Sequence, residues 1–434
     1  MTDLFSRLNL SLNAKFIGNI LLRPVFYSTR VSEPLRILFC GSDEFSSASL
    51  ISLKEEKTKN PGLIRSIDVL CRPAKKVGRG MKKFAEVIKR SFYIVVPIKA
   101  VAQDIGFPVH ETEKLDQWEL PRPEGDDINL VIAVSFGLFL PARILRLVKY
   151  GGLNLHPSIL PNFRGAAPIE RTLMTGYGFT GVTLQTLDYK KFDHGIVIAQ
   201  TKPWLKVPDL CTYARLLDIV TPIAANMLVE SLNQRLFVPP LKNMGWVPQA
   251  NEKLFYANKI TPEDKKMPWR SKNVTDGIVR TYNALGCLWS NVYVNHQSQK
   301  RLKFNHIYLD LQFVNIYTGS VSSPNSLREK LSTSIGRPIH HIVVPTSPNQ
   351  KQAVLYFENT SHKGCINFLF PCGTDREGSW SSVRVGEITI EGKKPTTAQQ
   401  ALKSISREGL WNLDFSNKSQ ASSEEYLIAY SLQD

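Results

Sequence analysis

Four short apolar runs, separated by segments of helical periodicity, place the tightest limits on the fold of this chain. The runs are Leu35–Gly41, Ile67–Leu70, Pro108–His110 and Ile128–Val134. Strands that alternate with helices in this way usually form a parallel sheet, because each crossover helix packs back onto the sheet. We therefore predict an α/β domain with a Rossmann-like, doubly wound, mainly parallel sheet. The turn at Gly41 lacks a G-x-G-x-x-G pattern, so a dinucleotide cofactor is not supported.

Polar side chains that suit acyl transfer follow the fourth run. Asn154 and His156 are two residues apart in an apolar segment that Pro157 ends, so on a strand both side chains face the same way. Asp193 lies in a turn after a second strand-like run, and its carboxylate could reach the imidazole. An amide can hold an oxyanion, a histidine can move a proton, and a carboxylate can orient and charge the histidine. From spacing alone, a hydrogen-bonded core pair remains the alternative.

Two features around these residues narrow the interpretation. The run from Asn154 to Pro161 reads Asn-x-His-x-Ser-hydrophobic-Leu-Pro, and Asp193-His194-Gly195 forms an Asp-x-Gly turn. Both resemble the hallmarks of the folate-dependent formyltransferases. This resemblance implies that Asn154, His156 and Asp193 are catalytic, that His194 has no role and faces solvent, and that no metal is needed. The folate would lie between the turn after residue 134 and the loop 161–168. The resemblance thus suggests these folate-binding residues: Phe136, Gly137, Leu138, Ser158, Leu160 and Pro161.

A basic loop and two further sites suggest contact with nucleic acid. Residues 71–83 contain six Lys or Arg residues and no acid, which suits phosphate binding. The Gly-Arg-Gly at its centre resembles an insertion in the methionyl-tRNA formyltransferases, which implies that Arg79 contacts the acceptor end of a tRNA. For residues 71–83 the alternative is a solvated surface loop without a partner. For the loop 161–168, which contains Arg164, the alternative is a purely structural loop. The predicted tRNA-binding residues are Arg79, Lys82, Lys83, Arg164, Lys393 and Lys394.

The C-terminal half has a different pattern. Residues 236–250 are rich in proline with little periodicity, which is typical of a linker. Short strand-like runs follow, which favour a small barrel or sandwich. In the family that the chain resembles, this part is a smaller OB-like β-barrel that binds tRNA. We predict a catalytic domain at 34–235, the linker at 236–250, the OB-like domain at 251–410 and a C-terminal tail at 411–434.

Composition and the first residues bear on location and partners. The formal net charge of the 434 residues is +16, which attracts polyanions such as nucleic acid. Residues 1–33 form a basic, acid-poor segment with an apolar face, typical of a mitochondrial transit peptide and leader. The six cysteines form no C-x-x-C pair, in keeping with a reducing compartment. No apolar run is long enough to cross a membrane. We expect a monomer of the mitochondrial matrix without stable membrane association.

The resemblance implies an enzyme of one-carbon formyl transfer. It would move the formyl group of 10-formyltetrahydrofolate, as co-substrate, to the α-amine of methionyl-tRNA, producing initiator N-formylmethionyl-tRNA for mitochondrial translation. Two alternatives remain. One is another formyltetrahydrofolate-using transferase or hydrolase, which would share the three polar residues but not the basic loop or the second domain. The other is a catalytically inactive tRNA-binding protein, against which the intact Asn154, His156 and Asp193 weigh.

Overall fold

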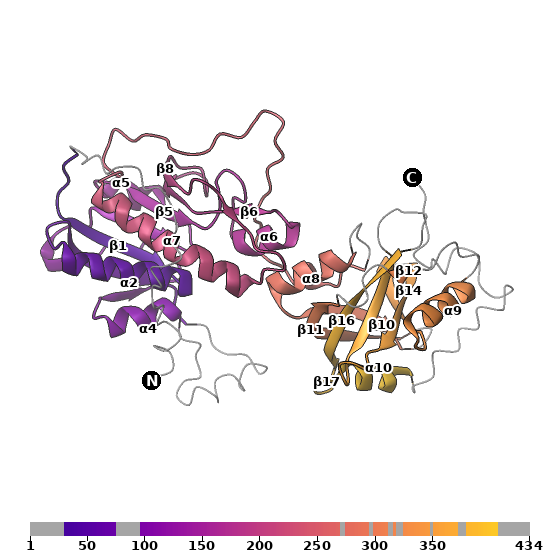
Figure 1. Ribbon diagram of the computed structural model, residues 1–434. Helices are drawn as coiled ribbons and strands as arrows, with labels where there is room; N and C mark the ends of the chain where they lie inside the picture. The colour runs from indigo at the N-terminus through magenta and orange to yellow at the C-terminus, as the bar shows by residue number, and fades with distance from the viewer. Residues whose placement is uncertain are drawn as a thin grey trace.

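The computed structural model describes residues 30–74, 96–269, 274–294, 298–310, 316–317, 324–347, 350–371 and 379–406, which form two domains joined by an irregular segment and helix α8 (Figure 1). Most of the predicted leader, the basic-loop residues Arg79, Lys82 and Lys83, and the predicted tail lie outside the described residues.

The first domain is built on a seven-stranded sheet with the strand order β3-β2-β1-β4-β5-β7-β8. The five strands from β3 to β5 are parallel, and β7 and β8 are antiparallel to their neighbours. The predicted Rossmann-like α/β class is confirmed. The strands are β1 (Leu35–Gly41), β2 (Ile64–Cys71), β3 (Val109–Glu111), β4 (Leu130–Val134), β5 (Gly152–His156), β7 (Thr183–Thr186) and β8 (Val197–Gln200). Strands β6 (Phe179–Thr180) and β9 (Leu205–Lys206) form a separate pair.

Alternation along the central strands produces two apolar faces. On β1, Ile37 and Phe39 belong to one buried cluster, whereas Leu38 and Cys40 belong to another. The first face is covered by α2 (Glu44–Lys59), α4 (Pro97–Asp104), α6 (Pro168–Thr175) and α7 (Tyr213–Asn233), and the second by α5 (Ala142–Leu147). The Asp43 side chain accepts a hydrogen bond from the Ser46 N–H and caps α2, as its position after β1 predicts.

The second domain is an antiparallel barrel with the strand order β10-β11-β16-β15-β14-β13, in which β13 lies against β10 and nearly closes the circle. This confirms the predicted smaller barrel. Its elements are α8 (Val274–Leu285), β10 (Leu288–Tyr293), β11 (Gln299–Leu309), β12 (Ile316–Tyr317), α9 (Pro324–Ile335), β13 (His340–Ser347), β14 (Gln350–Glu358), β15 (Ile366–Pro371), β16 (Ser379–Ile390), β17 (Thr396–Thr397) and α10 (Ala398–Ser406).

The segment between α7 and α8 crosses back over the first domain (Figure 1). Within the predicted linker, the Met244 N–H donates to the Val197 carbonyl and the Trp246 N–H to the Gln200 side chain, so this stretch lies along β8. Farther on, a short 3-10 turn at Glu263–Lys265 precedes α8. The domain boundaries remain predictions. Among the described residues, no helix is long and apolar enough to cross a membrane.

Candidate active site

The three predicted catalytic residues come together beside the carboxyl ends of β4 and β5. Leu153 and Leu155 of β5 point into the main core, so Asn154 and His156 point to the opposite face. There they line a cavity of about 500 Å³ together with Asp193. Ligands of open α/β sheets bind at this edge of the sheet, so the cavity lies where the topology predicts a ligand.

The turn that carries Asp193 is packed tightly against β7. Asp193 has a positive φ of 56°, and a Cβ on Gly195 would lie 1.7 Å from the Thr186 carbonyl oxygen. Only glycine allows the turn to approach the strand this closely. The approach brings the Asp193 side chain, which is 9% exposed, over the end of β5.

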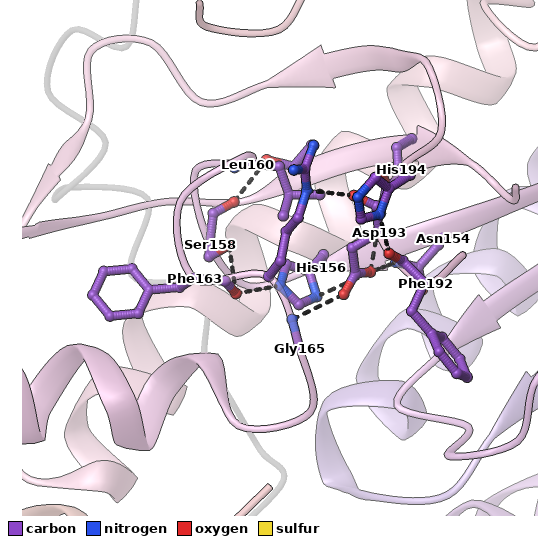
Figure 2. Close-up of polar contacts among 12 residues, drawn as sticks. Asn154, His156, Ser158, Leu160, Phe163, Gly165, Phe192, Asp193 and His194 are labelled. Atoms are coloured by element: carbon purple, nitrogen blue, oxygen red, sulfur yellow. Dashed lines mark hydrogen bonds and ion pairs between the residues drawn. The ribbon is translucent and has the colours of Figure 1, made fainter. Parts of the chain in front are cut away.

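The Asp193 carboxylate is held by three hydrogen-bond donors (Figure 2). Its Oδ1 accepts from Asn154 Nδ2 at 3.2 Å and from Gln185 Nε2 at 3.1 Å, and its Oδ2 accepts from the Gly165 N–H at 3.0 Å. Donors of this kind satisfy a largely buried carboxylate and fix its direction. The amide of Asn154 carries a second hydrogen, and Asn154 lines the cavity, so this N–H can reach a ligand oxygen.

His156 is oriented by a backbone carbonyl rather than by Asp193. Its Nε2 lies 3.0 Å from the Phe163 carbonyl oxygen, which can only accept, so Nε2 carries a hydrogen (Figure 2). Its Nδ1 lies 3.9 Å from Asp193 Oδ1, which is an ion-pair distance and too long for a hydrogen bond. In the neutral ring Nδ1 is therefore the acceptor, and a proton taken up there would face the carboxylate. The sequence predicted that the Asp193 carboxylate orients the imidazole; in the structure the Phe163 carbonyl does so.

The predicted folate-binding residues separate into two groups. Phe136, Gly137 and Leu138 line the cavity, as do Gly165 and Ala166 of the loop 161–168. The other three are not among the residues that line it: Ser158 and Leu160 are buried, the Ser158 hydroxyl donates to the Asn162 carbonyl, and the Leu160 N–H donates to Thr183 Oγ1. Ser158, Leu160 and Pro161 thus belong to the loop that supports the cavity wall.

The predicted tRNA-binding residues that the structure describes are also divided. Arg164 is half-buried, and its Nε donates to the Asp193 carbonyl at 2.8 Å, so part of its guanidinium stabilises the turn that carries Asp193. Lys393 and Lys394 are exposed between β16 and β17 of the barrel.

Sequence reasoning missed several residues of the cavity. Gln185 lies directly opposite Asn154 in the β5–β7 pairing and shares its carboxylate partner, and its position two after Thr183 on a strand is the signal that could have found it. The rings of Phe139 and Phe192, which pack edge to face at 5.0 Å, stand at the cavity surface. Asp43 also lines the cavity, where burial raises the pKa of its carboxyl group.

The arrangement suits proton transfer coupled to the addition of a nucleophile to a carbonyl group. Asn154 offers an N–H to a developing oxyanion, and His156 Nδ1 can take a proton and hold it beside Asp193. Among the described residues, no three His, Cys, Asp or Glu side chains are grouped so that they could hold a metal ion.

Comparison with known proteins adds independent findings. Residues 35–212 match the formyl transferase family model. The chain is 34% identical over 264 residues to the mitochondrial methionyl-tRNA formyltransferase of Saccharomyces cerevisiae, covering 55% of this chain and 64% of that protein. The chain therefore spans slightly less than two thirds of the yeast protein. It is 32% identical to the methionyl-tRNA formyltransferase of Burkholderia pseudomallei, covering 55% of this chain and 69% of that protein.

Solved structures give more distant matches. HypX from Aquifex aeolicus covers 87% of this chain and 48% of its own, with a TM-score of 0.43 and 14% identity. The sugar 3N-formyl transferase WlaRD covers 84% of this chain and 100% of its own, with a TM-score of 0.43 and 13% identity.

Proposed function

This chain belongs to the methionyl-tRNA formyltransferases of the formyl transferase family, and from that membership we propose its activity: transfer of a formyl group from 10-formyltetrahydrofolate to the α-amine of methionyl-tRNA, producing N-formylmethionyl-tRNA for translation initiation. The observation that carries the proposal is the joint geometry of Asn154, His156 and Asp193 at one cavity, with Asn154 bonded to Asp193 and His156 at ion-pair distance from it.

The proposed chemistry uses each of these side chains at a named atom. The neutral amine nitrogen of the acceptor attacks the formyl carbon, and the carbonyl oxygen becomes an oxyanion that accepts the second N–H of Asn154. His156 Nδ1 takes the proton from the attacking nitrogen. The resulting imidazolium lies 3.9 Å from the Asp193 carboxylate. It then returns the proton to the departing folate nitrogen as the carbon–nitrogen bond breaks, which leaves the formamide and tetrahydrofolate.

A folate co-substrate suits membership of a formyl transferase family, and its identity as 10-formyltetrahydrofolate is part of the proposal. Phe136, Gly137, Leu138, Gly165 and Ala166 line the cavity in which it would bind. Glycines at this position let a flat ligand lie against the backbone. The chemistry requires no metal, because Asn154 and His156 supply the donors.

The proposed partner is initiator methionyl-tRNA, and the proposed location is the mitochondrial matrix. A net charge of +16 and the exposed Lys393 and Lys394 favour a polyanionic partner. The Saccharomyces cerevisiae relative carries the word mitochondrial in its name, and residues 1–33 have the composition of a transit peptide. The monomeric state and the absence of stable membrane association remain predictions.

The deciding experiment is formyl transfer from 10-formyltetrahydrofolate to methionyl-tRNA, with wild type beside His156→Ala. Glycinamide ribonucleotide, free methionine and water serve as rival acceptors. We expect transfer to methionyl-tRNA alone, and a fall in rate of about 10²–10⁴-fold in the variant. Activity on a rival acceptor without transfer to the tRNA would contradict the proposed acceptor. Binding of the tRNA without any transfer would support the alternative of an inactive tRNA-binding protein.

A further inference from the structure

The catalytic side chains depend on the backbone of the loop 161–168. The Phe163 carbonyl accepts from His156 Nε2, and the Gly165 N–H donates to Asp193 Oδ2, both at 3.0 Å. Because both contacts are made by main-chain atoms, anything that fixes the backbone of this loop also fixes the directions of the imidazole and the carboxylate.

A segment distant in sequence and outside the central sheet holds that backbone. Residues Phe255–Ala257, which we call the clamp, pair with the loop through a parallel bridge between Arg164 and Tyr256. The Phe163 N–H donates to the Phe255 carbonyl at 2.7 Å and the Ala257 N–H to the Arg164 carbonyl at 2.7 Å. Two more hydrogen bonds extend the pairing, from the Ala167 N–H to the Ala257 carbonyl and from the Phe255 N–H to Asn162 Oδ1.

The loop has a conformation that needs such support. Phe163 has a φ of 56°, in the left-handed region that disfavours a residue with a side chain. Its ring stacks on the Phe255 ring at 5.4 Å with an interplanar angle of 10°. A Cβ on Gly165 would lie 2.3 Å from the Ala257 carbonyl oxygen, so the clamp backbone occupies the space of a missing side chain. The contact between the loop and the clamp therefore requires a glycine at position 165 and the stacked rings of Phe163 and Phe255.

Arg171 of α6 binds the segment that directly follows the clamp, at Asn258 and Asp264. Its guanidinium donates to the Asn258 carbonyl at 3.0 Å and makes a bidentate pair with Asp264, at 2.6 and 2.9 Å. The Met267 N–H then donates to the Trp289 carbonyl of β10. A short stretch of chain therefore runs from the loop that orients His156 to the first strand of the barrel.

We propose that Phe255–Ala257 is a positioning element of the transfer reaction: it fixes the Phe163 carbonyl and the Gly165 N–H, and through them the tautomer of His156 and the direction of Asp193. The expected effect on kcat rests on the proposed function, whereas the expected effect on the His156 tautomer does not. It implies that the α/β domain without the clamp lacks a complete catalytic site.

The kinetic test compares Phe255→Ala with wild type in the full chain. Loss of the stacked ring loosens the loop, and displacement of catalytic groups by about 1 Å costs roughly 10²-fold in rate. We expect kcat to fall about 10- to 100-fold while KM for both substrates changes less than about threefold. Phe255→Tyr, which keeps the ring, should restore kcat. Phe179→Ala is the matched control, because it removes an exposed phenylalanine outside the clamp and the cavity.

A second readout does not depend on activity. The imidazole nitrogen chemical shifts of His156, assigned in ¹⁵N NMR by comparison with His156→Gln, report which nitrogen carries the hydrogen. We expect the Nε2–H form in wild type and a mixture in Phe255→Ala. If wild type fails to formylate methionyl-tRNA but its tautomer still differs from that of Phe255→Ala in this way, the proposed function fails and the positioning proposal stands.

Other outcomes would overturn the positioning proposal. A folded Phe255→Ala with unchanged kcat and tautomer would show that the loop holds itself. An increase only in KM for methionyl-tRNA would assign the segment to tRNA binding instead. If Phe255→Ala does not fold, Arg171→Lys provides the same test, because lysine cannot make the bidentate pair with Asp264; unchanged kcat and tautomer in that folded variant would also contradict the proposal.

Discussion

At the scale of single residues, one carbonyl oxygen decides which nitrogen of His156 can act. Because the Phe163 carbonyl accepts from Nε2, Nδ1 is the ring nitrogen left to accept a proton, on the side of Asp193. The position of Asp193 in turn depends on amide donors from two neighbouring strands, Asn154 of β5 and Gln185 of β7. The site is therefore a network in which Asn154, His156 and Asp193 are each held by a neighbouring group.

A first prediction concerns Gln185, which is 1% exposed and donates to Asp193. Gln185→Leu keeps the approximate volume but removes one hydrogen bond to a charged group, which is typically worth about 1.5–3 kcal/mol. We expect kcat for formyl transfer to fall roughly tenfold or more, with a similar KM. Gln185→Glu should be worse, since it places a second carboxylate beside Asp193. Steady-state kinetics check this, and an unchanged kcat in Gln185→Leu would mean that Asn154 and Gly165 suffice to hold Asp193.

At the scale of elements, local exceptions to the regular pattern shape both domains. In strand β11 the outward positions are mostly charged or polar, and the inward apolar pattern breaks. Leu302 and Phe304 point into the barrel, then His306 adopts a φ of 55° and shifts the alternation so that Ile307 is buried. The hydrogen-bonded pairing of β11 with β10 and β16 outweighs the low strand propensity of its charged and polar residues.

A second prediction concerns the turn that presents Asp193. Gly195→Ala would place a Cβ 1.7 Å from the Thr186 carbonyl oxygen, so the turn must move away from β7. We expect kcat to fall about 100-fold and the melting temperature to decrease. Gly178→Ala is the control, because a Cβ there meets nothing within 4 Å. Kinetics and thermal unfolding of the two variants provide the comparison, and equal behaviour would contradict the role given to Gly195.

A third prediction concerns strand β13. Burial, and to a smaller extent the nearby Arg328 and His340, lower the pKa of His341 to about 4. The unfolded chain binds a proton near the ordinary pKa of about 6.5 and the folded chain does not. Stability should therefore be fully present above about pH 6.5 and be lost as the pH falls toward 4, by at most about 3 kcal/mol. Urea unfolding at pH 5 and pH 7.5 measures this, and His341→Leu should reduce the difference.

At the scale of the whole molecule, charge and connection matter more than any single contact. Two separate apolar clusters support the α/β domain and the barrel, and α8 contributes to both: Ile278 and Val279 belong to the barrel cluster and Ala284 to the cluster of the first domain. The chain between the clamp and Met267 adds a second link, because the clamp pairs with the loop 161–168 and the Met267 N–H donates to the Trp289 carbonyl of β10. The net charge of the full chain is +16, so long-range attraction should act on the entire tRNA.

A fourth prediction follows from that charge. Binding that neutralises several phosphates weakens steeply with salt, so KM for methionyl-tRNA should rise about tenfold or more between 50 and 200 mM salt. KM for the folate should change far less. The double variant Lys393→Ala/Lys394→Ala should raise KM for the tRNA and reduce its salt dependence by a slope of about one to two, with kcat intact. A salt response identical to wild type would place these lysines outside the tRNA contact.

The sequence by itself determined the parallel sheet of the first domain and the residue types of the site. Both follow from local rules: apolar runs of strand length define β1 and β4, and spacing by two puts Asn154 and His156 on one face. The glycine after Asp193 likewise predicted a sharp turn. These features need only near neighbours in the chain, so they can be read without the fold.

Only the tertiary structure decided how the site is held. The Gln185–Asp193 bond requires the pairing of β5 with β7, and the support of Phe163 by Phe255 joins residues 92 positions apart. Ser158 and Leu160 were assigned to the ligand, although the Ser158 hydroxyl donates to the Asn162 carbonyl within the loop and the Leu160 N–H donates to Thr183 Oγ1 of β7. Contacts between distant segments depend on how the whole chain packs, and no local pattern in the sequence encodes them.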